Sequence, residues 1–306
     1  MEHLPTIRTC NPCDKRDAAA YEQLKPEAAL ANLLDRPGYH ASQDLFFVEV
    51  DGAVVGYLNV LPELGIGRVI LDYRVSPKFR PEGILTELLG KALERARSLG
   101  ARVAHINTRA AEQALSKFLS TIGFNAVRRY YEMSLVLSEA DLNTIELPSS
   151  AYRHLRSGEE GMLAQIQNSC FEGSWGYNPN TAEDISWRLN AKANAPDDII
   201  LALDRGKVIG YCWTVRNSSP HVYSRRGKGR IYMIGVHPDY RNRRIGRELL
   251  RAGLSLLQRS RVEVVNITVD NQNVAAIKLY ESLGFRRCEE TLWYEKVLNA
   301  PAIDNQ

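Results

Sequence analysis

Long apolar runs are missing from this chain of 306 residues. A membrane-spanning helix needs about 20 consecutive, mostly apolar residues, and no segment approaches that length. The first residues, MEHLPTIRTC, also lack the apolar core of a secretory signal peptide. We therefore expect a cytoplasmic protein that has no membrane partner.

Cysteine is scarce, and its number is odd. Five cysteines in a chain of this size argue against a disulfide framework. Cys10 and Cys13 form a C-x-x-C pair, but no second pair and no histidine cluster follows at the spacing of a zinc site. Chance or a minor redox role explains this pair better than metal binding, so we expect no metal.

A large excess of one charge is absent from the whole chain, in which 39 Lys and Arg stand against 36 Asp and Glu. This balance hides a local contrast. Residues 225–261 include 11 basic and 2 acidic side chains, a net charge of +9. Residues 64–100 include 7 basic and 4 acidic side chains, a net charge of +3. The first of these segments is therefore the better candidate for binding an anion.

What the chain does contain is an internal repeat. Residues 75–80 (VSPKFR) match residues 236–241 (VHPDYR), and residues 122–124 (IGF) match residues 283–285 (LGF). Both matches have an offset of 161 residues. The chain is therefore two copies of one domain.

An earlier part of the repeat has a shorter offset. Residues 51–57 (DGAVVGY) match residues 205–211 (RGKVIGY) at an offset of 154, so the second copy carries an insertion near residues 222–229. The length suits two domains of about 150 residues each. We predict an N-terminal domain at 1–140 and a C-terminal domain at 150–300.

The segment between these domains, residues 138–151, loses apolar periodicity and is the predicted linker. Within each copy, apolar patterns predict the element order β–β–β–α–β–α–β. The predicted strands are 46–50, 54–61, 103–108, 199–203, 208–215, 230–236 and 262–269, and the predicted helices are 84–99, 110–122, 245–260 and 273–283. This order predicts an α/β fold in which each copy has a mixed sheet with helices on its faces.

An arginine-rich turn separates the predicted strand that ends at Val236 from the predicted helix that begins at Ile245. A helix N-terminus offers unpaired N–H groups and a partial positive charge, which suit a pyrophosphate. Gly246 lets the backbone come close to a ligand. The turn adds the fork-shaped, permanently charged donors of Arg241, Arg243, Arg244 and Arg247.

Two motifs in this order resemble the GNAT superfamily of acyl-CoA N-acyltransferases. They are Val236-His-Pro followed by Arg241-x-x-x-x-Gly246, and Asn273-x-x-Ala276 followed by Leu279-Tyr280-x-x-x-Gly284-Phe285. The family's turn reads Arg/Gln-x-x-Gly-x-Gly/Ala, and Arg244 stands where its first glycine is expected. The resemblance covers both copies. This tandem layout is similar to that of mycothiol synthase-like members of the superfamily, although shared architecture does not transfer a substrate.

The resemblance implies acetyl-CoA as the donor and a primary amine of a small molecule or peptide as the acceptor. It also implies a splay between the fourth and fifth strands of the second copy, into which the pantetheine arm inserts. The residues that it places against the cofactor are Ile234, Val236, Arg241, Asn242, Arg243, Arg244, Ile245, Gly246, Arg247, Asn273 and Ala276. Asn273 has the alternative role of a helix cap.

Tyr280 matches the family's catalytic tyrosine, which protonates the leaving thiolate. A tyrosine with a pKa of about 10 can protonate a thiolate whose pKa is about 8.5. The alternative is that Tyr280 is a core aromatic of an amphipathic helix. The predicted fourth strand contains no carboxylate, so the base that deprotonates the amine stays open among Glu172, Asp270 and Tyr232.

Residues 170–179 (CFEGSWGYNP) are too aromatic for an ordinary solvated loop. In the family this region borders the acceptor cleft, so Glu172, Trp175 and Tyr177 are the candidate substrate contacts. The alternative is an aromatic cluster that packs a domain interface.

The first copy lacks the polar groups of the second. Pro81 removes a backbone donor from its turn, and Glu82 puts a negative charge where a pyrophosphate would bind. Leu119 occupies the place of Tyr280, and Glu112 that of Asn273. We predict that the first copy is structural and that the second is catalytic, with a weak second acyl-CoA site as the alternative for the first.

Two further functions stay open at this point. A sensor could bind acyl-CoA without turnover, and only Tyr280 argues against it. Residues 224–230 (SRRGKGR) could instead bind nucleic acid as a basic hairpin, although the interleaved apolar helices and Tyr280 make nucleic acid the weaker prediction.

Overall fold

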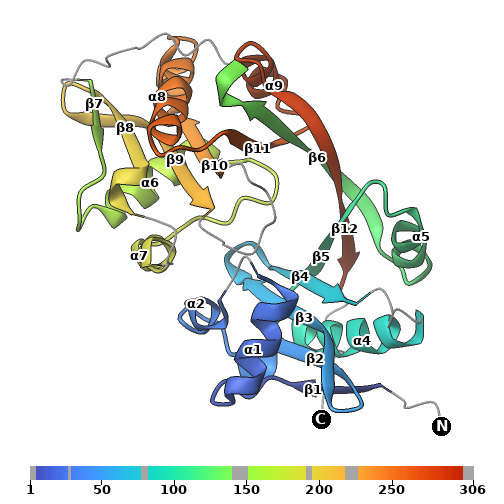
Figure 1. Ribbon diagram of the computed structural model, residues 1–306. Coiled ribbons are helices and arrows are strands. Elements are labelled where there is room, and N and C mark those ends of the chain that lie inside the picture. Colours follow the sequence, from blue (N-terminus) through green and yellow to red (C-terminus); the bar gives the residue numbers. More distant parts are fainter. Residues whose placement is uncertain are drawn as a thin grey trace, which may run out of the picture. The chain divides into compact units, whose positions relative to one another are not determined.

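The computed structural model describes residues 5–26, 29–76, 82–139, 151–190, 195–217 and 227–298. The chain folds into two compact units (Figure 1). Unit 1 comprises Met1–Arg128 and Thr291–Gln306, and unit 2 comprises Arg129–Glu290. Each unit is a mixed sheet with helices on its faces, so the predicted α/β class is confirmed.

The sheet of unit 1 has the strand order β1-β2-β3-β4-β5-β12. Its strands are β1 (Thr6–Thr9), β2 (Leu45–Val50), β3 (Ala53–Glu63), β4 (Arg68–Val75), β5 (Val103–Arg109) and β12 (Arg286–Val297). Its helices are α1 (Lys15–Leu24), α2 (Leu30–Leu34), α3 (Ala41–Asp44), α4 (Glu82–Ser98) and α5 (Gln113–Thr121), with a 3-10 turn η1 (Leu64–Ile66). All neighbouring strands are antiparallel except β4 and β5.

Alternating side chains divide the core of unit 1 into two layers. Phe46 and Val48 of β2 pack on one face of the sheet with the buried leucines of α4. Leu45 and Phe47 pack on the other face with residues of α1 and α2. The strand therefore reads as a continuous apolar run because both of its faces are covered.

The sheet of unit 2 has the strand order β6-β11-β10-β9-β8-β7. Its strands are β6 (Asn125–Val136), β7 (Tyr152–His154), β8 (Ile199–Asp204), β9 (Lys207–Asn217), β10 (Lys228–Val236) and β11 (Val264–Asp270). Its helices are α6 (Glu160–Phe171), α7 (Ala182–Asn190), α8 (Ile245–Arg259) and α9 (Val274–Glu281), with 3-10 turns η3 (Leu137–Glu139), η4 (Pro196–Asp198) and η5 (Pro238–Tyr240). Only β10 and β11 are parallel.

The strand β9 shows the same division of the core in unit 2. Cys212 faces the layer that contains α8 and α9, and Tyr211 and Trp213 face the layer that contains α6 and α7. The helix predicted at 245–260 is α8, and its apolar face packs in the core, since Leu249, Leu250, Leu254 and Leu257 are all fully buried.

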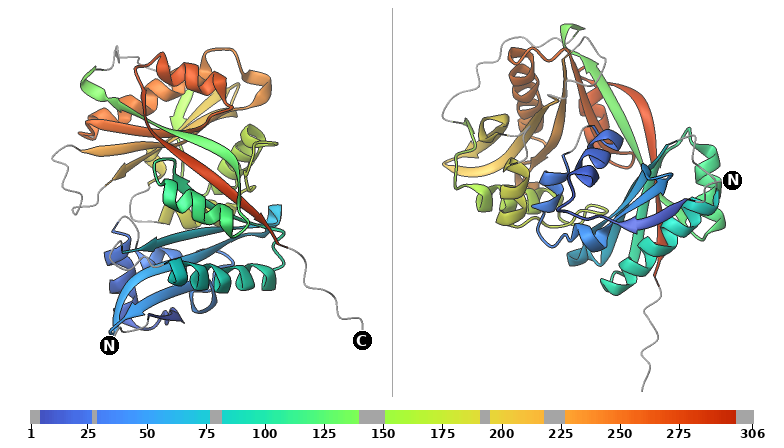
Figure 2. Two further views of the ribbon diagram at one scale, coloured as in Figure 1. Left: turned by 90° about the vertical axis from the view of Figure 1, so that its right-hand side faces the viewer. Right: turned by 60° about the horizontal axis from the view of Figure 1, so that its bottom comes forward.

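The last strand of each sequence copy completes the sheet of the other unit. β6 ends the first copy, yet its residues 130–136 pair antiparallel with β11 of unit 2. β12 ends the second copy, yet its residues 291–297 pair antiparallel with β5 of unit 1. Figure 2 shows the two exchanged strands from further sides, β6 in green and β12 in red. Along the chain, the boundaries between the two units therefore fall within β6 and β12. Residues 140–150 of the expected linker lie outside the described residues.

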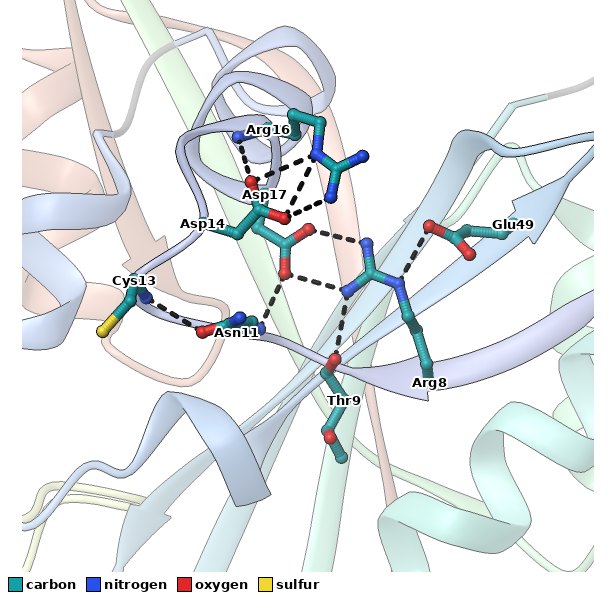
Figure 3. Close-up of polar contacts among 8 residues, drawn as sticks. All are labelled: Arg8, Thr9, Asn11, Cys13, Asp14, Arg16, Asp17 and Glu49. Carbon is teal, nitrogen blue, oxygen red and sulfur yellow. Dashed lines mark hydrogen bonds and ion pairs between the residues drawn. The ribbon is translucent and has the colours of Figure 1, made fainter.

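An arginine clamp holds the start of unit 1 together (Figure 3). Arg8 of β1 donates two hydrogen bonds to the carboxylate of Asp17 in α1, at 2.6 and 2.8 Å. The backbone N–H of Asn11 donates a third, at 2.7 Å, and Glu49 accepts from the Arg8 Nε at 2.8 Å. Burial opposes ionisation of Asp17, but these bonds lower its pKa below the ordinary value.

Unit 2 has a matching arginine clamp near its start. Arg153 of β7 donates to both carboxylate oxygens of Glu159 at 2.6 and 2.8 Å, and the backbone N–H of Arg156 donates to Glu159 at 2.9 Å. In both units the third bond comes from the residue three positions after the arginine. This part of the repeat was missed in the sequence because its spacing differs between the copies and only the arginine is identical.

Candidate active site

The turn after β10 uses two left-handed residues to enter α8. Asn242 has φ 63° and Arg244 has φ 64°, and Arg244 is the N-cap residue of α8. A residue other than glycine costs about 1 kcal/mol or more in this conformation. Arg244 thus adopts the left-handed conformation for which the family's pattern uses glycine, and its side chain adds a positive charge to the turn.

Two of the four arginines in the turn are tied to backbone oxygens. The Nε of Arg241 donates to the carbonyl of Val236 at 3.2 Å, and its Nη2 donates to the carbonyl of Cys170 at 2.9 Å. Arg243 donates to the carbonyl of Asp239 at 3.0 Å. Arg241 therefore fastens the turn to the end of α6, which sequence reasoning did not foresee.

The other two arginines differ from each other. Arg247 donates to the hydroxyl of Ser282 at 2.9 Å and so links α8 to the end of α9. Arg244 is exposed, and within the described residues its guanidinium has no protein partner. Of the four cations, the one at the N-terminus of α8 is thus the one left available to an anion.

Gly246 and Ile245 form the first turn of α8. A methyl group built on Gly246 would lie 3.6 Å from Val236 and 3.8 Å from Leu279, which are ordinary contact distances. The protein interior therefore accepts either residue of the family's Gly/Ala position, and packing alone does not require glycine here.

The two parallel strands beside this turn diverge. The paired register of β10 and β11 ends at Ile231 and Ile267, while β10 stays paired with β9 as far as Val236. A bulge at Tyr232 accompanies this change. The edge of β10 that includes Ile234 and Val236 is therefore open toward β11, and an extended ligand can add to such an edge as a strand does. This is the splay that the family resemblance implied.

The helix α9 begins at Asn273, whose side chain caps it. The Asn273 Oδ1 accepts a hydrogen bond from the backbone N–H of Ala276 at 3.1 Å. The capping role that was the alternative for Asn273 is therefore present. Its amide Nδ2 is exposed and has no partner among the described residues, so a second contact with a ligand is compatible with the cap.

Tyr280 is buried in the core of unit 2, with 6% of its surface exposed. Its ring lies 6.0 Å from that of Phe285, and its hydroxyl makes no hydrogen bond to any described residue. Burial raises its pKa above the ordinary value, and Cys212 adds to the effect. The core role that was its alternative is therefore real, and the hydroxyl stays protonated at neutral pH, the state that a general acid requires.

The three candidate acceptor contacts lie in different settings. Glu172 is exposed at the C-terminus of α6 and has no partner among the described residues. Trp175 is half-buried, with its ring 6.2 Å from that of Tyr130. Tyr177 stacks on Phe171 at 5.3 Å, and burial raises its pKa to about 12. Aromatic packing, the alternative role for this segment, is thus present at Tyr177, whereas Glu172 is exposed.

The other two candidate bases differ from Glu172. Asp270 ends β11, and its Oδ1 accepts the backbone N–H of Gln272 at 2.9 Å. Tyr232 projects from the bulge of β10 with 41% of its surface exposed. The exposed groups among the three are therefore Glu172 and Tyr232.

The first copy keeps the shape of this region without its polar groups. The paired register of β4 and β5 ends at Leu71 and Ile106, so its strands also diverge. Leu119, at the place of Tyr280, is fully buried. Glu112 accepts a bond from Thr108 at 2.9 Å and does not cap α5 with its side chain. Pro81 and the side chain of Glu82 lie outside the described residues.

The basic segment at 224–230 is in part a strand. Residues 224–226 lie outside the described residues, and β10 begins at Lys228. Arg230 makes a hydrogen bond to Thr268 and an ion pair with Glu132 at 3.7 Å. Its charge is therefore already paired.

Three further observations concern the ranges that the structure describes. In these ranges no group of three or more His, Cys, Asp or Glu side chains could hold a metal ion. Cys10 is buried and Cys13 is exposed, and all five cysteines are free. None of the described helices combines the length and the apolar character needed to cross a membrane.

Comparisons with known proteins identify the family of this chain. The profile of the family described as "Acetyltransferase (GNAT) family" matches residues 11–124 and 161–285. A mycothiol acetyltransferase of Nocardia farcinica is 28% identical over 279 residues, which cover 88% of this chain and 87% of that protein.

Solved structures share the fold. A GCN5-related N-acetyltransferase from Sphaerobacter thermophilus has a TM-score of 0.72 at 22% identity, covering 98% of this chain and 97% of that one. A tandem GNAT protein from the clavulanic acid biosynthesis pathway has a TM-score of 0.73 at 16% identity, covering 98% and 100%. Since the family profile matches both sequence copies, this chain belongs to the GNAT acetyltransferase family and is a tandem acyltransferase.

Proposed function

We propose that the second copy transfers an acetyl group from acetyl-CoA to a primary amine of a small molecule or peptide, and that the first copy is structural. The observation that carries the proposal is the contrast at one helix position. Tyr280 has a protonated hydroxyl without a protein partner among the described residues, whereas Leu119 fills the matched place in the first copy.

Binding of the donor follows from the open strand edge and the turn. The pantetheine arm would lie along β10 beside Ile234 and Val236, where β11 diverges. The pyrophosphate would lie at the N-terminus of α8, against the backbone of residues 242–247 and the side chain of Arg244. The remaining arginines of the turn support it by holding α6, α8 and α9 in place.

The chemical step removes two protons from the amine and delivers one to the leaving sulfur. The amine loses a proton to a base or to water, and its nitrogen then bonds to the carbonyl carbon of the thioester while the backbone N–H of Val236 polarises the carbonyl. The carbon–sulfur bond breaks, and the thiolate takes the proton of Tyr280. The nitrogen gives its second proton to the phenolate, directly or through solvent, which leaves a neutral amide and a protonated Tyr280. Holding the two reactants together supplies much of the rate enhancement.

Glu172 and Tyr232 are the candidate bases that geometry favours, because both are exposed. A carboxylate accepts a proton from an ammonium group through a bridging water more readily than an ordinary tyrosine does near neutral pH. We therefore place Glu172 before Tyr232 as the base, with Asp270 third.

A sensor that binds acyl-CoA without turnover is the second candidate function. Two observations favour it: the ring of Tyr280 is packed in the core, and β10 carries no carboxylate. In this case the donor site would be intact but no amine would be consumed.

The deciding experiment measures release of free thiol from acetyl-CoA against a panel of amines. The panel begins with an amine precursor of mycothiol, because relatives of this chain are named mycothiol acetyltransferase. Aminoglycosides, amino acids and peptide N-termini follow. Turnover with any amine that falls about 10²- to 10⁴-fold in Tyr280→Phe supports the enzyme. Tight binding of acetyl-CoA without turnover across the panel would favour the sensor.

A further inference from the structure

Three buried polar groups in the layer between α6 and β9 of unit 2 lack hydrogen bonds. They are the Nε2 of Gln167, the hydroxyl of Tyr211 and the Nε1 of Trp213, and none finds a partner among the described protein atoms. All three side chains are fully buried. Such a group costs about 1–3 kcal/mol when it stays unpaired, so three in one place call for a cause.

The three groups lie in a single layer between α6 and β9. Tyr211 and Trp213 project from the same face of β9 and pack in the core that includes α6. Gln167 belongs to α6, and its Oε1 accepts a bond from Asn180 at 2.9 Å. Asn180 also donates to the hydroxyl of Tyr177 at 3.1 Å, and Tyr177 stacks on Phe171, which packs against the cluster that contains Tyr211. The unpaired groups therefore border one polar network.

In unit 1, the residue that matches Tyr211 does have a hydrogen-bond partner. Tyr57 precedes Tyr211 by the offset of the repeat, 154 residues, and it is equally buried. Its hydroxyl donates to the carboxylate of Asp72 at 3.4 Å. Asp72 lies on β4 at the place that Met233 has on β10, 161 residues later. Tyr211 lacks such an acceptor because an apolar residue occupies the matched place.

The matched positions two residues further along β3 and β9 also differ in their hydrogen bonding. Asn59 of β3 matches Trp213 at the same offset of 154 residues. The Oδ1 of Asn59 accepts a bond from the hydroxyl of Tyr39 at 2.7 Å, inside the core. In the first copy, therefore, the side chains at both positions have hydrogen-bond partners in the protein. In the second copy, the polar groups at both positions are unpaired.

The cluster lies beside one exposed side chain and near the proposed donor site. Tyr232, with 41% of its surface exposed, meets the ring of Trp213 edge-on at 5.2 Å. Rotation of such an exposed side chain is fast, on the picosecond-to-nanosecond scale. Trp213 pairs with Met233, which is three residues before Val236 and thus about 10 Å along the strand. That span suits a small acceptor molecule.

We propose that Gln167, Tyr211 and Trp213 recognise a neutral oxygen, a hydroxyl or an amide carbonyl, on the amine acceptor. The indole and the carboxamide present N–H donors, and the tyrosine can donate as well. The unpaired groups belong to neutral side chains, and an ionised carboxylate is costly to bury without a cation of its own. The assignment rests on the proposed acetyl transfer, and it makes these three residues specificity-determining.

The test compares two matched substitutions. Tyr211→Phe removes a hydroxyl that the free protein leaves unpaired, so the melting temperature of the free protein should not fall. Tyr57→Phe removes a hydroxyl that is bonded to Asp72, so the melting temperature should fall. A drop with Tyr211→Phe as large as that with Tyr57→Phe would show that Tyr211 is bonded in the free protein, and would overturn the proposal.

The second readout is selectivity between amines that differ in hydroxylation, glucosamine against cyclohexylamine and ethanolamine against propylamine. The wild type should prefer the hydroxylated member, and Tyr211→Phe and Gln167→Met should each reduce that preference about 3- to 10-fold, with KM for acetyl-CoA unchanged. Tyr57→Phe should leave the preference as it is. An equal preference in wild type and both variants would refute the inference.

The failure of the proposed function would look different. If no amine is turned over, calorimetric titration of the same four amines into the protein with bound coenzyme A still decides the inference. Tighter binding of the hydroxylated amines that weakens in Tyr211→Phe supports the recognition site, and binding without that difference refutes it.

Discussion

At one matched helix position unit 2 carries Tyr280 and unit 1 carries Leu119, and both side chains are buried. At another, Tyr211 and Tyr57 are the same residue, yet only Tyr57 has a bonding partner for its hydroxyl among the described residues. The apolar frame is therefore common to both units, and the difference between them lies in a few polar atoms. A duplicated fold can lose or gain a site through such atoms without any change in its core.

The largest expected effect comes from separating the copies. A fragment of residues 150–306 lacks β6, whose residues 130–136 complete the sheet of unit 2. The unpaired edge of β11 should prevent cooperative folding, because a ladder and its covered core are both lost. Circular dichroism during thermal unfolding would show no cooperative transition. A sharp transition together with binding of acetyl-CoA would contradict the importance of the exchanged strand.

The second effect tests the contrast between Tyr280 and Leu119. Tyr280→Phe should lower kcat by about 10²- to 10⁴-fold, because the proton donor for the thiolate is lost. Binding of acetyl-CoA should change little, since the hydroxyl is needed only in the transition state. Leu119→Met, a substitution that conserves volume, is the control in unit 1 and should leave kcat unchanged. Wild-type turnover by Tyr280→Phe would assign Tyr280 to packing alone.

The third effect sharpens the comparison of the two arginine clamps. Asp17 is 1% exposed and Glu159 is 24% exposed. Asp17→Asn should therefore cost about 2 kcal/mol of unfolding free energy, because the buried carboxylate loses its charge-assisted hydrogen bonds, although Arg8 itself is 36% exposed. Glu159→Gln should cost about 1 kcal/mol, as expected for a pair that solvent screens. Equal losses in urea unfolding would show that burial does not distinguish the clamps.

The acid response of the Asp17 clamp has a definite sign. The pKa of Asp17 is lowered in the folded state, so its contribution to stability is present above the unfolded value, about 3.9. It is lost as the pH falls further toward the folded value. Unfolding free energies measured between pH 5 and pH 3 should fall less steeply in Asp17→Asn than in the wild type.

The smallest effect distinguishes two arginines of the turn. Arg244→Ala should weaken acetyl-CoA binding about 10-fold at low salt without loss of stability, because the side chain has no partner among the described residues. Arg241→Ala should weaken binding and also lower the melting temperature, because two backbone carbonyls lose their donor. Calorimetry and thermal unfolding separate the two outcomes. Unchanged binding by Arg244→Ala would remove it from the donor site.

Part of this picture could be predicted from the sequence. The repeat and the helices at 84–99 and 245–260 depend on local patterns, and the structure has α4 and α8 at those places. The partners of Arg241 could not be predicted, because Cys170 is 71 residues away and offers only a backbone oxygen. The exchange of β6 and β12 was missed for a similar reason, since a strand's own pattern does not specify which β-edge it pairs with.

The strand exchange has a consequence for synthesis of the chain on the ribosome. β5 ends at Arg109, but the strand that covers its edge begins its pairing at Thr291. At about 5–20 residues per second, the nascent chain carries this open edge for about 10 to 40 s. Unit 1 is encoded first and yet completed last, so a pause in translation would lengthen the exposure of this edge, and the same unit should gain most from a chaperone that shields β-edges.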